Sequence, residues 1–334
     1  MSIAVLKRTT AWVLALMLLM GLCACATGEA QTGECGPNLS WTLDGEGRLT
    51  ISGAGDMADF DNAPCGPWGN GVRSVVIEEG VTGIGNFAFE SCSALTEATL
   101  PEGLERIGFN AFEGCTALAK VDIPSSVTVI ESKAFRHCES LERAVIPEGV
   151  THLKNSTFQG CEKLAEVIIP EGVTEIGWGV FYGCMKLKAV TLPRSLKTLG
   201  DAVFTDCVNL KDIDIPEGVT AIGKEAFYAC MGLQSLALPE SLRTVGKGAF
   251  NGCMELKAVT LPAQVAEIGD EAFAFCTGLE SIGIPAGVGR IGDGAFNRCD
   301  ALKTVRFAGT AEAWSAVSIG GDNDALQAAE ILYE

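Results

Sequence analysis

Residues 207–216, CVNLKDIDIP, recur in altered form through most of the chain. The cysteine of this stretch returns every 23 residues, at Cys92, Cys115, Cys138, Cys161, Cys184, Cys207, Cys230, Cys253, Cys276 and Cys299. A phenylalanine stands three residues before each of these cysteines, and a leucine stands three residues after it. A strict repeat of this length is typical of a solenoid, in which each unit covers the apolar faces of its neighbours.

Within one unit, the pattern predicts two short strands and a short helix. Ile213 and Ile215 alternate with aspartates, and this period of two indicates a strand with one buried face. Pro216 ends that strand because proline has no N–H for a sheet, and Pro-Glu-Gly is typical of a turn. Residues 219–222 predict a second short strand, which Gly223 closes. In most units an Asn, Asp or Ser follows and predicts the N-cap of a single helical turn.

Two phrases in the repeats, IPEGVTAIGKEAFYAC and LKAVTLP, resemble the BspA-like branch of the bacterial leucine-rich repeats. The resemblance covers all the repeats and extends to the segments on either side of them. It implies an α/β repeat solenoid, a right-handed leucine-rich-repeat rod of about ten 23-residue coils, with a binding role at the cell surface. It supplies no catalytic residues.

Length and charge restrict the classes of partner. The chain has 334 residues and a formal net charge of −18, and removal of residues 1–24, with Lys7 and Arg8, makes it −20. Such an acidic chain is not expected to bind nucleic acid or to adsorb to anionic lipid through its charge.

The N-terminal segment predicts export. Lys7 and Arg8 precede an apolar run over residues 11–22, which is short for a membrane span and typical of a signal peptide. Leu22, Cys23 and Ala24 before Cys25 resemble a bacterial lipobox. The resemblance implies a lipoprotein signal peptide over residues 1–24, lipidation of Cys25 and anchoring at the cell surface. The alternative is ordinary cleavage after Ala26 and secretion. Residues 25–34 are small and polar and predict a flexible tether.

The segments on either side of the repeats predict caps. Residues 35–71 form the predicted N-terminal cap, with a hairpin from residues 39–43 and 49–51. Residues 72–307 form the solenoid, and residues 308–334 form a C-terminal cap with a helix over residues 311–317. Trp314 is expected to lie across the apolar end of the last coil. Cys35 and Cys65 fall outside the 23-residue register, so a disulfide between them and two free thiols are both open.

The sequence predicts no catalytic, cofactor or metal site. Equivalent cysteines in a solenoid point the same way, which predicts a buried file of free thiols. Zinc requires converging ligands at paired local spacing, and the repeat cysteines lack that spacing. The histidines, His137 and His152, have no partner pattern for a triad, and no phosphate-binding loop occurs. A carbohydrate-processing enzyme is disfavoured because no paired carboxylates stand out from the repeat columns.

The candidate binding residues are those that depart from the polar surface columns. Val145 and Ile168 are neighbours at outward strand positions, with Arg143 beside them. Trp178, Tyr182 and Tyr228 are aromatic residues at the predicted helical turns, and exposed aromatics are favoured binding anchors. The alternative is that isolated surface aromatics have no binding role.

We expect a non-enzymatic, surface-displayed binding or adhesion module that acts through a solenoid face. That it recognises a protein is what the BspA-like resemblance implies, since the residues themselves do not indicate the class of partner. Candidate partners are host matrix or plasma proteins, other microbial surfaces, or glycans. Contact with the membrane is expected only through the lipid anchor. The alternative is a structural spacer or envelope scaffold that has no specific ligand.

Overall fold

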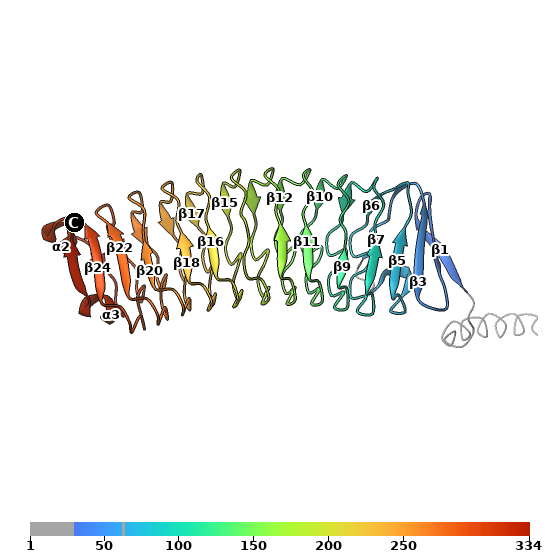
Figure 1. Ribbon diagram of the computed structural model, residues 1–334. Helices are drawn as coiled ribbons and strands as arrows, with labels where there is room; N and C mark the ends of the chain where they lie inside the picture. Colours follow the sequence, from blue (N-terminus) through green and yellow to red (C-terminus); the bar gives the residue numbers. More distant parts are fainter. Residues whose placement is uncertain (1–29, 62–63) are drawn as a thin grey trace, which may run out of the picture.

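The computed structural model describes residues 30–61 and 64–334, so the predicted signal peptide and Cys25 lie outside the described residues. The coils stack into an elongated rod, with the N-terminal cap and the C-terminal cap at opposite ends (Figure 1). Within the described part, no helix has the length and apolar character needed to cross a membrane. The repeat prediction is therefore confirmed as a single continuous stack.

Each coil contributes one strand to a main row along the rod. These strands are β5 (Ser74–Ile77), β7 (Glu97–Thr99), β9 (Lys120–Val121), β11 (Arg143–Val145), β13 (Glu166–Ile168), β16 (Asp212–Asp214), β18 (Ser235–Ala237), β20 (Ala258–Thr260), β22 (Ser281–Pro285) and β24 (Thr304–Ala308). The row is divided into four sheets, and the paired neighbours within them run parallel with a 23-residue offset, as in Asp212↔Ser235. In the coil between β13 and β16, the row is reduced to a single bridge, Ala189↔Asp212.

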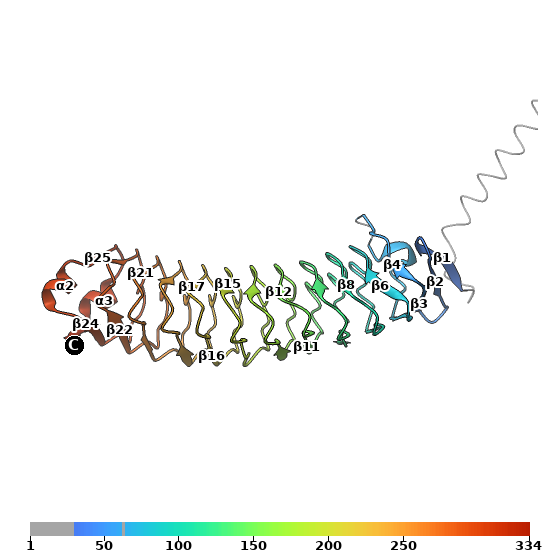
Figure 2. The same ribbon diagram turned by 90° about the horizontal axis from the view of Figure 1, so that it is seen from above.

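A second row of shorter strands runs along another side of the rod (Figure 2). Its members are β6 (Val81–Ile84), β8 (Arg106–Ile107), β10 (Val129–Ile130), β12 (His152–Leu153), β14 (Glu175–Ile176), β15 (Thr198–Leu199), β17 (Ala221–Ile222), β19 (Thr244–Val245), β21 (Glu267–Ile268), β23 (Arg290–Ile291) and β25 (Ser318–Ile319). From β12 to β25 this row is one parallel sheet. Both predicted strands are thus present in every coil except the one between β13 and β16, where the main strand is reduced to a bridge.

The core is a file of stacked phenylalanine rings. From Phe89 to Phe296, each ring lies 5.0–6.0 Å from the next, measured between centroids, and neighbouring planes are within 16° of parallel. Each of these side chains is fully buried, as is the leucine three residues after nearly every repeat cysteine. The 23-residue period therefore places equivalent side chains in contact from one coil to the next.

The predicted helical turn in each coil is wrong, because the structure has consecutive β-turns there. The N–H of Glu90 donates to Phe87 within the coil, but the N–H of Phe89 donates to Ala111 of the next coil. Phe87 and Ser91 take the left-handed backbone conformation, with φ of 61° and 62°. A helix would direct all its N–H groups along its own axis, whereas these turns direct alternate N–H groups to the neighbouring coil.

The predicted N-cap residues consequently cap the next coil rather than their own. Oδ1 of Asp201 accepts the N–H of Lys224 at 2.7 Å, and Oδ1 of Asn155 accepts the N–H of Trp178 at 2.9 Å. Asp270 accepts the N–H of Asp293 at 3.1 Å in the same way. The side-chain chemistry was predicted correctly, but its partner lies 23 residues on.

The N-terminal cap contains the predicted hairpin, formed by β2 (Leu39–Leu43) and β3 (Arg48–Gly53). The predicted tether is too long, since β1 (Gln31–Gly36) pairs with β2 and takes up residues 31–34. The cap also holds the short strand β4 (Gly55–Asp56) and a 3₁₀ turn, η2 (Gly66–Trp68). Trp68 stacks on the first ring of the file at 5.2 Å and so closes the apolar end.

The disulfide alternative for Cys35 and Cys65 is wrong. Cys65 is joined to Cys92, with 4.9 Å between their Cα atoms, while Cys35 is buried and free. The N–H of Cys65 donates to the carbonyl of Glu90, which places Cys65 one rung before Cys92 in the cysteine file. Cys65 does not occupy a repeat position, and its backbone is left-handed (φ 58°). Its side chain therefore need not point in the direction that the repeat cysteines share.

The other repeat cysteines match the prediction of a free, buried file. The thiol of Cys115 donates to the carbonyl of Phe89 in the preceding coil at 3.1 Å. The same bond recurs at every later repeat cysteine, at 3.0–3.4 Å. Each of these phenylalanine carbonyls also accepts the backbone N–H of the cysteine in its own coil, so the thiol of the next coil adds a second hydrogen bond to it. This gives the constant spacing of Phe and Cys within the chain a structural reason.

The C-terminal cap consists of α2 (Ala311–Ser315), α3 (Asp324–Ala328) and β26 (Glu330–Tyr333). The predicted helix over residues 311–317 corresponds to α2. Trp314 packs edge-on against Phe307 of β24, 5.0 Å between ring centroids, as predicted for a residue that covers the last coil. β26 pairs in parallel with β24 and occupies the position of a further main strand.

Candidate binding surfaces

No side-chain arrangement in residues 30–61 and 64–334 has the ligands for a metal ion, since no group of three His, Cys, Asp or Glu converges there. The repeat cysteines are poor nucleophiles, because burial raises the pKa of each thiol far above 9.0 and thiols react as thiolates. The remaining candidates are surfaces that could contact a partner.

The first surface is the strand patch, which consists of Arg143, Val145 and Ile168. Val145 pairs directly with Ile168 across β11 and β13, and both side chains are exposed. Arg143 lies two residue pairs away, on the same face of the strand, and forms an ion pair with Glu166, with Nε 3.0 Å from Oε2. The structure therefore brings these three predicted residues together on the main-strand side of the rod.

The predicted aromatic residues lie at the turns, away from the strand patch. Trp178 is exposed at the position whose N–H is capped by Asn155. Tyr182 and Tyr228 occupy the same position two coils apart, with Asp206 of the intervening coil between them. Burial, followed by the negative charge of Asp206, raises the pKa of Tyr182, and Tyr228 is close enough to add to the shift. The six predicted residues thus belong to two separate surfaces.

A third set of exposed apolar residues was missed by the sequence reasoning. Met185, Met231 and Met254 are all exposed, and each directly follows a repeat cysteine. Val208 holds the same position in the coil between Met185 and Met231 and is partly exposed. We call these four residues the methionine column. The sequence does contain this signal. In four consecutive repeats, the residue that directly follows the repeat cysteine is apolar.

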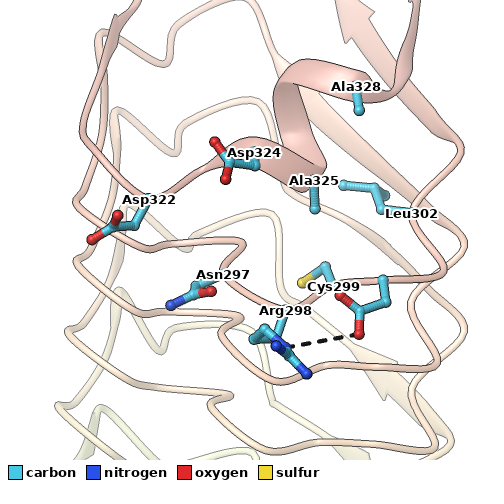
Figure 3. A pocket seen from close by; sticks show the side chains of 9 residues that line it. Asn297, Arg298, Cys299, Leu302, Asp322, Asp324, Ala325 and Ala328 are labelled. Atoms are coloured by element: carbon cyan, nitrogen blue, oxygen red, sulfur yellow. Dashed lines mark ion pairs between the residues drawn. The ribbon is translucent and has the colours of Figure 1, made fainter.

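Two hollows occur near the C-terminal end. A shallow groove of about 490 Å³ follows the proline turns, with Pro262, Ala263 and Pro285 among its lining residues. A second hollow of about 400 Å³ lies between the last coil and α3 (Figure 3). Its arginine, Arg298, is already paired with Asp300 at 3.8 Å. Neither hollow contains any of the predicted binding residues.

The repeat region matches a known family. The family model described as BspA type leucine rich repeat region matches residues 82–211 and 197–317, in six copies. The chain belongs to the BspA-type leucine-rich-repeat family. The BspA-type resemblance that the repeat phrases indicated is thereby confirmed.

Solved structures with similar folds include other bacterial leucine-rich-repeat proteins. A leucine rich cell surface protein from Faecalibacterium prausnitzii A2-165 is 26% identical, over 88% of this chain and 99% of that chain, with a TM-score of 0.48. A leucine-rich repeat protein from Bacteroides ovatus is 23% identical, over 92% and 99%, with a TM-score of 0.45. The leucine rich repeat protein of T. pallidum is 26% identical, over 67% and 91%, with a TM-score of 0.41. Among curated proteins, no sequence matches this BspA-type chain.

Proposed function

We propose that this BspA-type protein is a non-enzymatic binding module, displayed at the cell surface, that recognises a protein partner. The observation that carries the proposal is the strand patch, where Val145 and Ile168 are exposed side by side in a column that is otherwise mostly polar. The buried centre of a protein interface is more apolar than the rest of the surface and is enriched in arginine, so two exposed aliphatic side chains beside Arg143 fit such a centre. The leucine-rich-repeat family supports an interaction role in general.

The proposed location rests on the lipobox-like residues before Cys25, which lie outside the described residues. We expect the mature chain to begin at Cys25 with a lipid on its thiol. Intact-mass measurement of the protein extracted from membranes should show a diacyl or triacyl mass increment on an N-terminal Cys25 peptide. An unmodified chain that begins at Thr27 would instead support ordinary cleavage after Ala26 and secretion.

The partner proposal is tested with the strand patch and Trp178. We expect Arg143→Ala, Val145→Asp or Trp178→Ala to weaken binding to the captured partner at least tenfold, because each removes an exposed group without opening the core. Whole chain and variants are compared on host matrix proteins, plasma proteins and microbial surface proteins by surface plasmon resonance. Thermal unfolding should be unchanged, since surface substitutions usually alter stability by less than about 0.5 kcal/mol.

A matched control uses Thr99→Asp, which places the same charge at the equivalent outward position of β7. It should leave binding intact. Unaltered affinity in all three patch variants would remove the patch from the proposal. A chain that captures no protein from any of these sources would support the spacer alternative, and capture that is abolished by glycosidase treatment of the source would indicate a glycan ligand.

A further inference from the structure

Two Asn-Gly pairs occur in the chain, Asn70-Gly71 and Asn251-Gly252. In such a pair, the side-chain amide of asparagine can react with the backbone nitrogen of the glycine, because glycine has no side chain that shields this nitrogen. The product is a cyclic succinimide, which is the intermediate of spontaneous deamidation. The reaction requires that the backbone of the pair can turn and that its nitrogen is accessible. The fold gives the two pairs opposite surroundings in both respects.

Asn70 lies in an exposed turn that joins the N-terminal cap to the solenoid. The turn begins after Trp68, the buried last residue of η2, and ends before Val72, which is also buried. Asn70 and Gly71 are both exposed. A methyl group added to either glycine of the turn, Gly69 or Gly71, would meet no atom within 4 Å. The turn therefore has open space around it in which its backbone can change conformation.

The nitrogen of Gly71 is also free to react. In the described residues, its N–H donates no hydrogen bond. The flanking N–H groups are bonded, that of Gly69 to the carbonyl of Cys65 at 3.1 Å and that of Arg73 to the carbonyl of Gly47 at 2.8 Å. A backbone N–H that has an acceptor must give up that bond before its nitrogen can attack. The chain is thus held on both sides of the pair, but the reacting nitrogen itself has no such bond to lose.

The second pair, Asn251-Gly252, lies in one of the turns between coils and is fixed there. Asn251 is 7% exposed, and its carbonyl accepts the N–H of Ala229 in the preceding coil at 2.7 Å. The N–H of Gly252 donates to the carbonyl of Ala274 in the following coil at 2.8 Å. Ring closure at this pair would break the bond from Gly252 and turn a carbonyl that holds the preceding coil. We therefore expect the buried pair to be protected as long as the rod is folded.

We propose that Asn70 is a site of spontaneous deamidation, which converts the turn between the N-terminal cap and the solenoid to a mixture of aspartate and isoaspartate. The nitrogen of Gly71 loses its proton and attacks Cγ of Asn70, so that a new C–N bond closes the succinimide ring. The bond from Cγ to Nδ2 breaks, and Nδ2 takes up a proton and leaves as ammonia. The side-chain amide supplies the leaving group, and the step needs no oxidant, reductant or enzyme.

Water then opens the ring at one of its two carbonyls. Addition at Cγ breaks the new bond and gives aspartate with the original main chain. Addition at the backbone carbonyl breaks the original peptide bond and gives isoaspartate, in which the main chain runs through Cβ and Cγ. Both products carry a carboxylate in place of the amide.

Deamidation adds one negative charge to a chain whose net charge is already −18, and isoaspartate lengthens the main chain by one methylene group. Both changes fall between points that the fold holds in place, the disulfide of Cys65 and the bond from Arg73 to Gly47. Because water does not restore the amide, the modified fraction rises with the age of the chain. The inference goes beyond the proposed binding function and does not depend on it.

The test follows both pairs in one sample of the whole, disulfide-bonded chain. The protein is incubated at pH 8, digested at acidic pH to limit further reaction, and mapped by mass spectrometry over time. We expect the Asn70 peptide to be deamidated at least tenfold faster than the Asn251 peptide, and more slowly at pH 6 because the attacking nitrogen must lose its proton. In guanidinium chloride with a reductant, the two pairs should react at comparable rates, since the fold no longer protects Asn251.

The variant is Gly71→Ala, which places a methyl group beside the attacking nitrogen. Alanine fits at this position, because the methyl would meet no atom within 4 Å and the backbone there is not left-handed. We expect the substitution to slow deamidation of Asn70 at least tenfold, with no change at Asn251 or in thermal unfolding. Equal rates at Asn70 and Asn251 in the folded chain, or an unaltered rate in Gly71→Ala, would overturn the inference.

Discussion

Between pH 8 and pH 10, the free energy of unfolding should fall by about 12 kcal/mol in total. Nine buried thiols, from Cys115 to Cys299, have a pKa held above the ordinary 9.0 by burial, as at Cys299, where it is raised to about 12. As the pH passes 9, the unfolded chain loses these protons and the folded chain keeps them, so the unfolded state binds fewer protons and stability falls. Each thiol therefore contributes about 1.4 kcal/mol to the loss between pH 8 and pH 10, and its contribution is fully present about one pH unit below 9.

The measurement is urea unfolding of the reduced protein between pH 8 and pH 10, followed by circular dichroism. The matched variant is the triple substitution Cys184→Ala, Cys207→Ala and Cys230→Ala, which removes three of the nine thiols. Its stability should fall by only about 8 kcal/mol over the same range, because the other titrating groups are the same in both chains. Identical slopes would contradict the assignment of alkaline instability to the cysteine file.

Replacing Phe204 with alanine should lower the free energy of unfolding by about 3–5 kcal/mol, the usual cost of deleting a buried aromatic ring. The ring of Phe204 is fully buried and stacks on Phe181 at 5.5 Å and on Phe227 at 5.3 Å. The cavity would separate the two halves of the file, and the neighbouring coils cannot collapse into it without breaking their own parallel pairing.

The control for this variant is Phe275→Ala, which removes the same ring from a position that is 47% exposed. Its cost should stay below about 1 kcal/mol, because little transfer from water and no cavity are involved. Both are measured by equilibrium urea unfolding at pH 7. A Phe204→Ala chain as stable as the Phe275→Ala chain would mean that the ring file does not hold the coils together.

Both predictions depend on the same property of the rod. Each repeat position meets its own counterpart in the next coil, so a feature of one coil is multiplied along the stack. A single buried thiol in a globular domain has a small effect on the pH dependence of stability. In this rod, nine buried thiols contribute to it over the same pH range. The phenylalanine rings likewise act as one column, in which every interior member has two stacked neighbours.

The candidate surfaces were predicted in part. The alternation along β11 and β13 identified Val145 and Ile168 as outward residues, because period two in a half-buried strand specifies direction. Tyr182 and Tyr228 were correctly given a common column. The methionine column was missed although its residues recur every 23 positions, because the period alone does not say whether a residue at a turn points outward. The exposure of Met231 follows from the turn geometry rather than from a helical or strand pattern.

By itself, the sequence determined the period, the two strands of each coil, the files of phenylalanine and cysteine, and the caps. It could do so because equivalent positions in a solenoid become neighbours in space, so that a separation of 23 residues translates directly into contact. Only the tertiary structure decided that Phe87 and Ser91 form turns instead of a helix, that Cys65 joins Cys92, and that the methionine column faces solvent. Each of these features depends on the residues that a backbone N–H or a side chain contacts in the neighbouring coil. Such contacts between coils cannot be read from the sequence of one coil.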